Sequence, residues 1–221
     1  MALRLLPFRQ YDEQDVINLF QFGGTPNGAP SETTADSGML VKVSESDLSK
    51  DPVEYLGSHA LLGSSGYPHV ARNGYPQVPL KVEAAGANDQ AIGITLNQTL
   101  THDENDENLL RYPQKKAELF AVTSGEAVPI ASKGIFTFDE SAVASPASDG
   151  DWEVTASKNN VAVQAAAGKI KLTTATAAAD ASEIVIGKVL GTGKRTAQTN
   201  SDQFAGAAGE SANYVVIKLD L

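Results

Sequence analysis

The side chains best suited to acid–base chemistry at neutral pH are the three histidines, His59, His69 and His102. All three fall in segments expected to be loops. A Ser-His-Asp triad needs a nucleophile, a base and an orienting acid in one place, and the sequence has no G-x-S-x-G elbow to present a serine. We therefore assign no catalytic residue and expect no enzyme, although a hydrolase with a hidden histidine site stays open as an alternative.

The densest group of carboxylates is HDENDEN at positions 102–108. Calcium prefers several carboxylate oxygens, and an EF-hand loop has Gly at its sixth position and Glu at its twelfth. Counted from Asp103, these positions hold Asn108 and Gln114. We therefore interpret the segment as a solvated acidic loop and predict no metal.

Two further chemistries are disfavoured by the sequence. Residues 191–196, GTGKRT, lack the G-x-x-x-x-G-K-[ST] spacing of a phosphate loop, so a turn between strands is expected there. The absence of cysteine excludes disulfides, thiol catalysis and Cys-based zinc sites. We predict that the chain uses no cofactor.

The elements that would position any site are predicted to be strands. From Val78 onward apolar residues recur with period two between turn signals, which is typical of an antiparallel sandwich or barrel. Residues 184–190 are more continuously apolar than the other strand candidates and are expected to be a central strand buried on both faces. The chain ends in an alternating pattern, so its C-terminus is expected in a sheet. Strands are expected over 39–43, 78–82, 92–96, 119–122, 135–138, 152–154, 161–163, 170–172, 184–190 and 215–221.

The first 22 residues form an apolar unit ahead of a Gly- and Pro-rich stretch at 23–38. Asp12 could cap a short helix that carries apolar residues at helical spacing. We interpret 1–22 as an arm that docks on another chain, and a strand and helix in the protein's own core is the alternative. The candidate partner-binding residues are Leu3, Leu5, Phe8, Tyr11, Val16, Leu19, Phe20 and Phe22.

Three units follow from this division of the chain: an arm at 1–22, linker and interface loops at 23–76, and a β-rich domain at 77–221. The second unit has a one-turn helix signal at 51–57 and a long Gly-, Ser- and Pro-rich loop at 57–76, for which a subunit interface is expected.

The net charge of −10 argues against nucleic-acid binding, because an acidic chain repels phosphates. No apolar run reaches the roughly 18 residues of a membrane span, and the N-terminus is a poor signal peptide. We therefore expect synthesis in the cytoplasm, with no nucleic-acid and no membrane partner.

Several segments together resemble the capsid decoration (cement) proteins of tailed bacteriophages. They are the opening MALRLLPFRQYDEQDVINLF, then AIGITLNQTL, NLLRYPQKKAELFAVTSGEAVPIASKGIFTF, IVIGKVLGTG and the terminal YVVIKLDL, about half of the chain in all. The region 141–183 does not share this likeness, so extra strands or a protruding insertion are expected there.

The resemblance implies a mainly β, antiparallel fold of the β-tulip or barrel-like kind with an extended N-terminal arm. It implies a homotrimer on the outer capsid surface of the virion, bound to the major capsid protein and stabilising the joints between capsomers, with other decoration proteins as further candidate partners. A receptor- or glycan-binding module of a phage fibre or tail is the alternative function.

Overall fold

The computed structural model describes residues 5–23, 36–46, 78, 80–103, 105, 107–109, 111–144, 161–194 and 213–221. Over these ranges the chain is mainly β, which confirms the predicted fold class. Several predictions lie outside the described residues: Leu3, His59, His69, most of the 23–38 linker, the helix at 51–57, the loop at 57–76 and the strand at 152–154.

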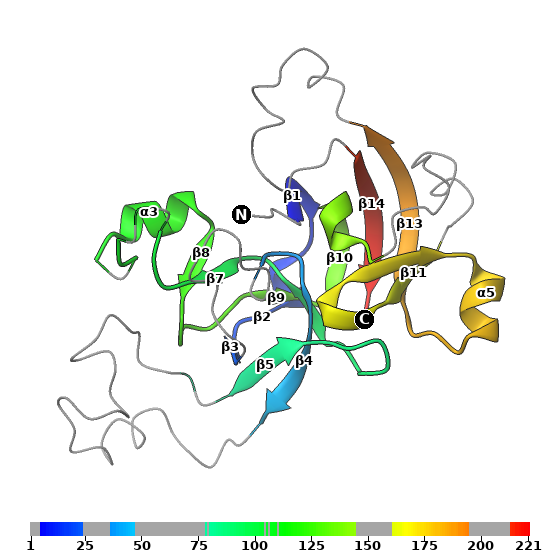
Figure 1. Ribbon diagram of the computed structural model, residues 1–221, viewed down its shortest axis with the longest axis horizontal. Coiled ribbons are helices and arrows are strands. Elements are labelled where there is room, and N and C mark those ends of the chain that lie inside the picture. Colours follow the sequence, from blue (N-terminus) through cyan, green and yellow to red (C-terminus); the bar gives the residue numbers. More distant parts are fainter. Residues whose placement is uncertain are drawn as a thin grey trace.

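Six antiparallel strands form the largest layer, sheet A, on the right of Figure 1. Their order is β1 (Leu5–Gln10), β10 (Lys133–Asp139), β14 (Asn213–Asp220), β13 (Val185–Lys194), β11 (Val161–Gln164) and β12 (Ile170–Thr173). The C-terminal strand β14 lies inside this sheet, as predicted. The described part of 141–183 supplies β11 and β12, so it continues sheet A.

One face of sheet A is buried and the other faces solvent. In β14 the buried side chains Val215, Ile217 and Leu219 alternate with more exposed ones. The expectation that β13 is buried on both faces is wrong, since Val185 and Leu190 are 52% and 54% exposed. No described element covers the outer face of sheet A over these two residues.

A second six-stranded sheet, sheet B, is the one that is covered on both sides. Leu40 and Ile94 pack with sheet A in one apolar cluster, whereas Val41 and Ile130 belong to a second cluster. All pairs in sheet B are antiparallel except β3 with β5, which is parallel. The order is β2 (Val16–Ile17), β9 (Ile130–Ala131), β6 (Gly93–Thr95), β4 (Leu40–Glu45), β5 (Lys81–Ala84) and β3 (Gln21–Phe22).

The connection between β2 and β3 forces sheet B to curl. These strands form its two opposite edges, which would lie about 24 Å apart in a flat sheet with about 4.8 Å between strands. The chain from Ile17 to Gln21 spans at most about 14 Å. The segment after β2 also reaches the chain before β9, because Val128 N–H donates to Phe20 O at 2.8 Å. Sheet B is thus barrel-like without closing over the described residues.

The N-terminal segment is therefore not a separate arm. Strand β1 pairs with β10 at the edge of sheet A, and β2 and β3 form the edges of sheet B. Leu5 and Phe22 are 1% and 5% exposed. The expectation of an extended arm is corrected for residues 5–22, because their strands pair with strands of this chain and Leu5 and Phe22 are buried in it.

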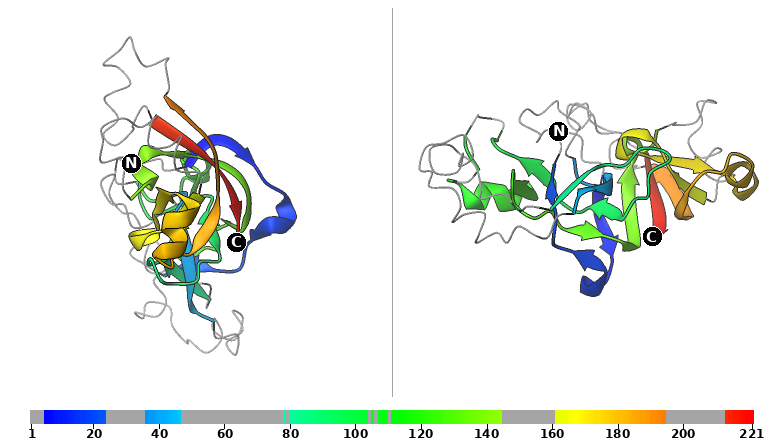
Figure 2. Two further views of the ribbon diagram at one scale, coloured as in Figure 1. Left: turned by 90° about the vertical axis from the view of Figure 1, so that its right-hand side faces the viewer. Right: turned by 90° about the horizontal axis from the view of Figure 1, so that it is seen from below.

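A two-stranded parallel sheet C, β7 (Gln98–Leu100) with β8 (Ala121–Thr123), carries helix α3 (Pro113–Glu118) and a small third core around Leu109. Figure 2 shows α3 and α5 (Ala175–Asp180) at opposite ends of the molecule. The remaining turns are η1 (Glu13–Asp15), η2 (Glu140–Ala142) and η3 (Ala166–Gly168).

Where a helix is expected after Asp12, the structure has only the three-residue turn η1. The Asp12 carboxylate accepts the N–H of Gln14 at 3.0 Å, as an N-cap does. Val16 and Ile17 then leave the helix because they pair with β9. Among the described helices, none has the length and apolarity required to cross a membrane.

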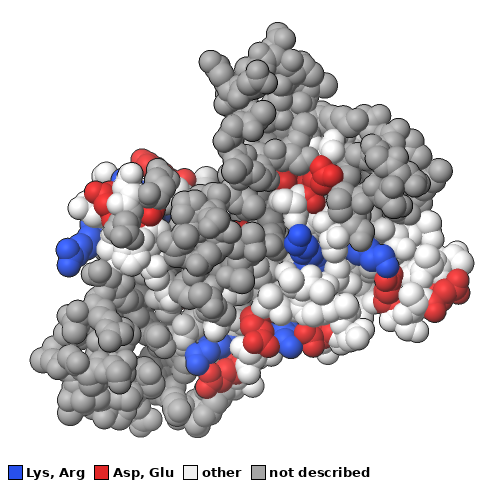
Figure 3. Space-filling view, in the orientation of Figure 1, with Lys and Arg blue, Asp and Glu red and all other residues white. Residues whose placement is uncertain are grey.

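Basic and acidic side chains are interspersed on the face shown in Figure 3. Lys42 contacts Glu83 at 3.2 Å and Asp89 at 2.9 Å, and Lys81 contacts Glu45 at 2.7 Å. Lys42 lowers the pKa of the Asp89 carboxyl. Such exposed pairs contribute little to stability, but they show how described surface charges are commonly neutralised.

One cross-strand pair in sheet A lacks this neutralisation and gives a first prediction. Lys188 in β13 lies directly opposite Lys218 in β14, and both are exposed. Like charges in this position are destabilising, and opposite charges stabilise by about 0.2–1 kcal/mol. We expect Lys188→Glu to raise the free energy of unfolding in urea by about this amount. Lys188→Gln removes only the repulsion, so a glutamate variant no more stable than the glutamine variant would contradict the prediction.

Candidate functional site

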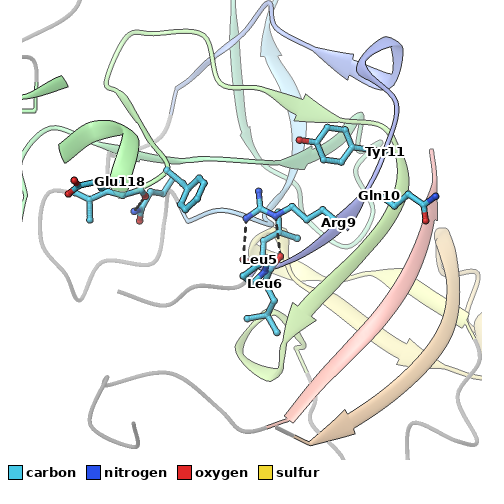
Figure 4. Close-up of a pocket in the computed structure, with 10 residues that line it drawn as sticks. Leu5, Leu6, Arg9, Gln10, Tyr11 and Glu118 are labelled. Atoms are coloured by element: carbon cyan, nitrogen blue, oxygen red, sulfur yellow. Dashed lines mark hydrogen bonds between the residues drawn. The ribbon is translucent and has the colours of Figure 1, made fainter. Parts of the chain in front are cut away.

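A hollow of about 730 Å³ lies between β1, the end of α3 and the start of β7 (Figure 4). We call it the β1 groove. Most of its wall is aliphatic or aromatic, and a single arginine lies among these groups. Its lining consists of Leu5, Leu6, Pro7, Arg9, Gln10, Tyr11, Gln98, Glu118, Leu119 and Phe120.

Arg9 ties β1 to the chain between β6 and β7. Its Nε donates to Leu6 O at 3.1 Å, Nη1 to Leu96 O at 3.2 Å and Nη2 to Leu5 O at 3.4 Å. The side chain is half-buried, and this burial lowers the pKa of the guanidinium, an effect that Tyr11 opposes. Arginine nevertheless stays charged in proteins, so the groove has a fixed positive charge.

The positive charge of Arg9 has no carboxylate partner in the described part of the chain. The ion pairs there involve lysines, and Glu118, the acidic residue of the groove lining, is not paired with Arg9. Removing a charge from water is unfavourable unless another charge or hydrogen bonds compensate it. Backbone carbonyls supply part of that compensation, and no counter-charge to Arg9 occurs among the residues that the structure describes.

Phe120 forms the opposite wall in a strained conformation. Its φ is +47°, in the left-handed region that favours glycine, at the position just beyond α3 and its cap Leu119. The ring is 60% exposed and lies 5.9 Å from the Arg9 guanidinium carbon. An aromatic residue in this region costs on the order of 1–2 kcal/mol. Such strain often marks a functional position.

Strand β7 holds Phe120 in place from the other side. The Gln98 N–H donates to Phe120 O at 3.1 Å, and the Gln98 side-chain amide donates to Leu119 O at 2.7 Å. The Phe120 N–H donates in turn to Ala117 O at 3.1 Å. The backbone around the ring is therefore fixed by three hydrogen bonds, which offset the strain.

Helix α3, which precedes Phe120, is anchored by two lysines. The Lys115 ammonium contacts Asp103 and Glu107, each at 2.5 Å, and the Lys116 ammonium contacts Glu126 at 2.7 Å. These three ion pairs join the helix to neighbouring loops. They restrict the movement of α3, so they position Leu119 and Phe120 at the groove.

The structure corrects our interpretation of the acidic loop at Asp103. Its side chain is 2% exposed and not solvated, and it accepts N–H groups from Asn105 at 2.9 Å and Glu107 at 2.8 Å. Lys115 is the main cause of the lowered pKa of the Asp103 carboxyl, and the two backbone donors lower it further. Asp103 also raises the pKa of Lys115. No cluster of three metal-ligating side chains occurs in the described ranges.

This arrangement predicts a pH effect. A carboxyl whose pKa is lowered by folding stabilises the protein above its unfolded pKa of about 3.9, and this stabilisation is lost as the pH falls through the folded pKa. We expect Asp103→Asn to unfold at lower urea than wild type at pH 7, with the difference shrinking below about pH 4. Amide exchange at Asn105 and Glu107 reports the loop directly.

Asp220→Asn is the matched control, because Asp220 is 64% exposed in its contact with Lys133. It should change the urea midpoint little at either pH. An Asp103→Asn variant whose deficit is the same at pH 7 and pH 3 would show that the lost interaction is not that of the ionised carboxylate.

The eight predicted binding residues differ in their burial and in their position relative to the β1 groove. Leu5 and Phe22 are buried, and Val16 and Phe20 are half-buried against the two main cores. Phe8, Tyr11 and Leu19 are 63%, 41% and 49% exposed. Only Leu5 and Tyr11 line the β1 groove, and the Tyr11 ring stacks on that of Phe136 with centroids 5.7 Å apart. Leu3 lies outside the described residues, so three of the seven that the structure describes are accessible.

Arg9 and Phe120 are the groove residues that the sequence did not single out. Arg9 had one weak signal, since it is a charged residue within an apolar segment. Phe120 had none, because its left-handed backbone and its position over Arg9 depend on contacts with β7 and β1.

No family model matches this chain, and no curated protein or solved structure is significantly similar to it.

Phe120 provides a test of whether its ring serves the protein's own stability. Phe120→Gly relieves the left-handed strain but loses a cation–π contact of about 0.5–1 kcal/mol. We expect the free energy of unfolding to change by no more than about 1 kcal/mol. Phe136→Ala, at a residue with no exposure, should cost about 3–5 kcal/mol. If Phe120→Gly lowered the free energy of unfolding in urea as much as Phe136→Ala, the ring of Phe120 would be contributing to stability as a core side chain does.

Proposed function

We propose that this chain is a non-enzymatic structural protein of a phage virion. It binds the outer surface of an icosahedral head as a homotrimer and stabilises the joints between capsomers of the major capsid protein. The proposal begins from the resemblance of the opening segment, 91–138 and the last strands to capsid decoration proteins. A mainly β fold is consistent with that resemblance.

The observation that carries the proposal is the set of exposed aromatic side chains around β1. Phe8 and Phe120 are each at least 60% exposed, and Tyr11, three residues after Phe8, is 41% exposed and lines the β1 groove with Phe120. Aromatic residues and arginine are enriched in protein interfaces and among their energetically dominant contacts. Exposed aromatic side chains on an ordered backbone are better suited to binding than exposed aromatic side chains on a free loop, because less conformational entropy is lost.

The folded N-terminal segment changes how attachment works. A tethered arm would lose conformational entropy when it binds, whereas residues held in β1 are already ordered. Burying one large apolar side chain contributes about 1.5–3 kcal/mol before other costs. Three copies in a trimer would multiply such weak contacts through avidity.

The described side chains also support a non-catalytic role. His102, the one histidine among them, has its Nδ1 3.1 Å from the hydroxyl of Thr101 in a surface loop. In that contact the imidazole meets a neighbouring hydroxyl and not a carboxylate that would orient it as a base. The β1 groove contains a fixed arginine and two glutamines, groups that bind rather than transfer protons, beside Tyr11 and Glu118.

A reconstitution experiment tests the proposal. Purified heads that lack decoration protein are mixed with wild-type chain, and occupancy and the temperature of head disruption are measured. We expect wild type to bind and to raise that temperature. Phe8→Ser should weaken binding about tenfold, because one buried aromatic contact of roughly 1.4 kcal/mol or more is lost.

Leu190→Ser is the matched control, since Leu190 is an exposed apolar residue on β13, far from β1 in the order of sheet A. It should bind heads as wild type does. Imaging of the complexes shows where the chain is attached. Failure to bind heads, or binding only to tail fibres or host-surface glycans, would replace this proposal with the receptor-binding alternative.

A further inference from the structure

We infer that the β1 groove binds an acidic side chain of a partner protein, presented next to an apolar one, with Arg9 as the counter-ion. The identity of the partner as a shell protein rests on the proposed function. The chemistry of recognition comes from the groove itself, and it can be tested on the isolated chain.

The guanidinium has the capacity to bind a carboxylate. Arginine has five N–H donors, and three of them bond to the carbonyls of Leu5, Leu6 and Leu96. Two donors remain for a ligand. Hydrogen bonds between a guanidinium and a carboxylate are charge-assisted and about twice as strong as neutral ones. A carboxylate would therefore supply the counter-charge that the described chain does not.

The apolar walls of the groove determine which side chain of the partner can lie next to the bound carboxylate. Leu6, Pro7 and Leu119 line the groove, and the Phe120 ring closes it over Arg9. These surfaces would be covered by an aliphatic or aromatic neighbour of the acidic residue. Apolar cover also excludes water from the ion pair, which strengthens the attraction.

Addition of a partner strand to β1 is a poorer explanation of this site. Pro7 has no N–H to donate, and the carbonyls of Leu5 and Leu6 already accept bonds from Arg9. The pairing register also shifts between Leu5 and Arg9. Irregularity and proline are how proteins protect edge strands from further pairing. The groove is therefore suited to side chains and not to a strand.

Charge complementarity supports an acidic ligand in spite of the net charge of −10. An acidic surface weakly repels an acidic partner in most orientations, and Glu118 adds to this repulsion within the groove. The attraction is therefore local to the Arg9 guanidinium, and it favours the orientation that brings the two opposite charges together. Electrostatic complementarity of this kind contributes specificity and register more than raw affinity.

The test is an NMR titration of the full-length labelled chain with two blocked peptides, Ala-Leu-Glu-Phe-Ala and Ala-Leu-Gln-Phe-Ala. Only the ligand charge differs, so no protein variant has to fold. We expect saturable shifts at the Arg9 Nε–H and the Phe120 ring, with about tenfold tighter binding of the glutamate peptide. Its advantage should shrink at high salt. Equal affinities, shifts elsewhere, or no saturable shift would overturn the inference.

Two variants separate the parts of the site. Arg9→Lys keeps a positive charge without the planar pair of donors, so it should reduce the preference for glutamate. Phe120→Gly should weaken both peptides equally, and Lys188→Gln, at an exposed cation in sheet A, should change neither affinity. Shifts of the same signals with protein concentration alone would assign the groove to a second copy and overturn the inference.

These results are distinguishable from those of the head experiment. Wild type that discriminates the peptides but does not bind heads would refute the proposed function and leave the groove chemistry intact. Wild type that binds heads but does not discriminate the peptides would refute the groove inference alone.

Discussion

The fold depends on the short connection between β2 and β3. Because it joins the two opposite edges of sheet B across only a few residues, the sheet must curl. Curling gathers Phe22, Val41, Val82 and Ile130 into one cluster, and Leu40 and Ile94 then meet sheet A on the other face. A sheet of short strands thereby becomes the covered middle of the molecule, with the longer strands of sheet A outside it.

The same constraint determines how the N-terminal segment can act. Its ends are fixed by the burial of Leu5 and Phe22, and Arg9 bonds β1 to the carbonyl of Leu96. What remains accessible is the exposed side of β1, where Phe8 lies. Attachment through an ordered surface has a smaller entropic cost than attachment through a tether. It also requires the partner to match a fixed shape, which favours specificity.

The β1 groove is assembled from two parts of the chain that are far apart in sequence. β1 supplies the cation, and the end of α3 supplies a ring held in a left-handed backbone conformation. The buried Asp103 and the two lysines of α3 keep that ring in place. Strain at Phe120 is tolerated because neighbouring hydrogen bonds fix its backbone, as is common where a side chain serves recognition.

Local pattern in the sequence determined the mainly β class, most strand positions in the described chain and the alternating burial of β14, because period-two burial is a property of neighbouring residues. It also determined that Phe8, Tyr11 and Leu19 belong to an apolar N-terminal unit. Tertiary structure decided that this unit is part of both sheets, that β13 has an exposed face, and that Asp103 is buried against Lys115. It alone placed Phe120 over Arg9. Pairing partners, layer coverage and left-handed strain depend on contacts between distant residues, which a local pattern does not encode.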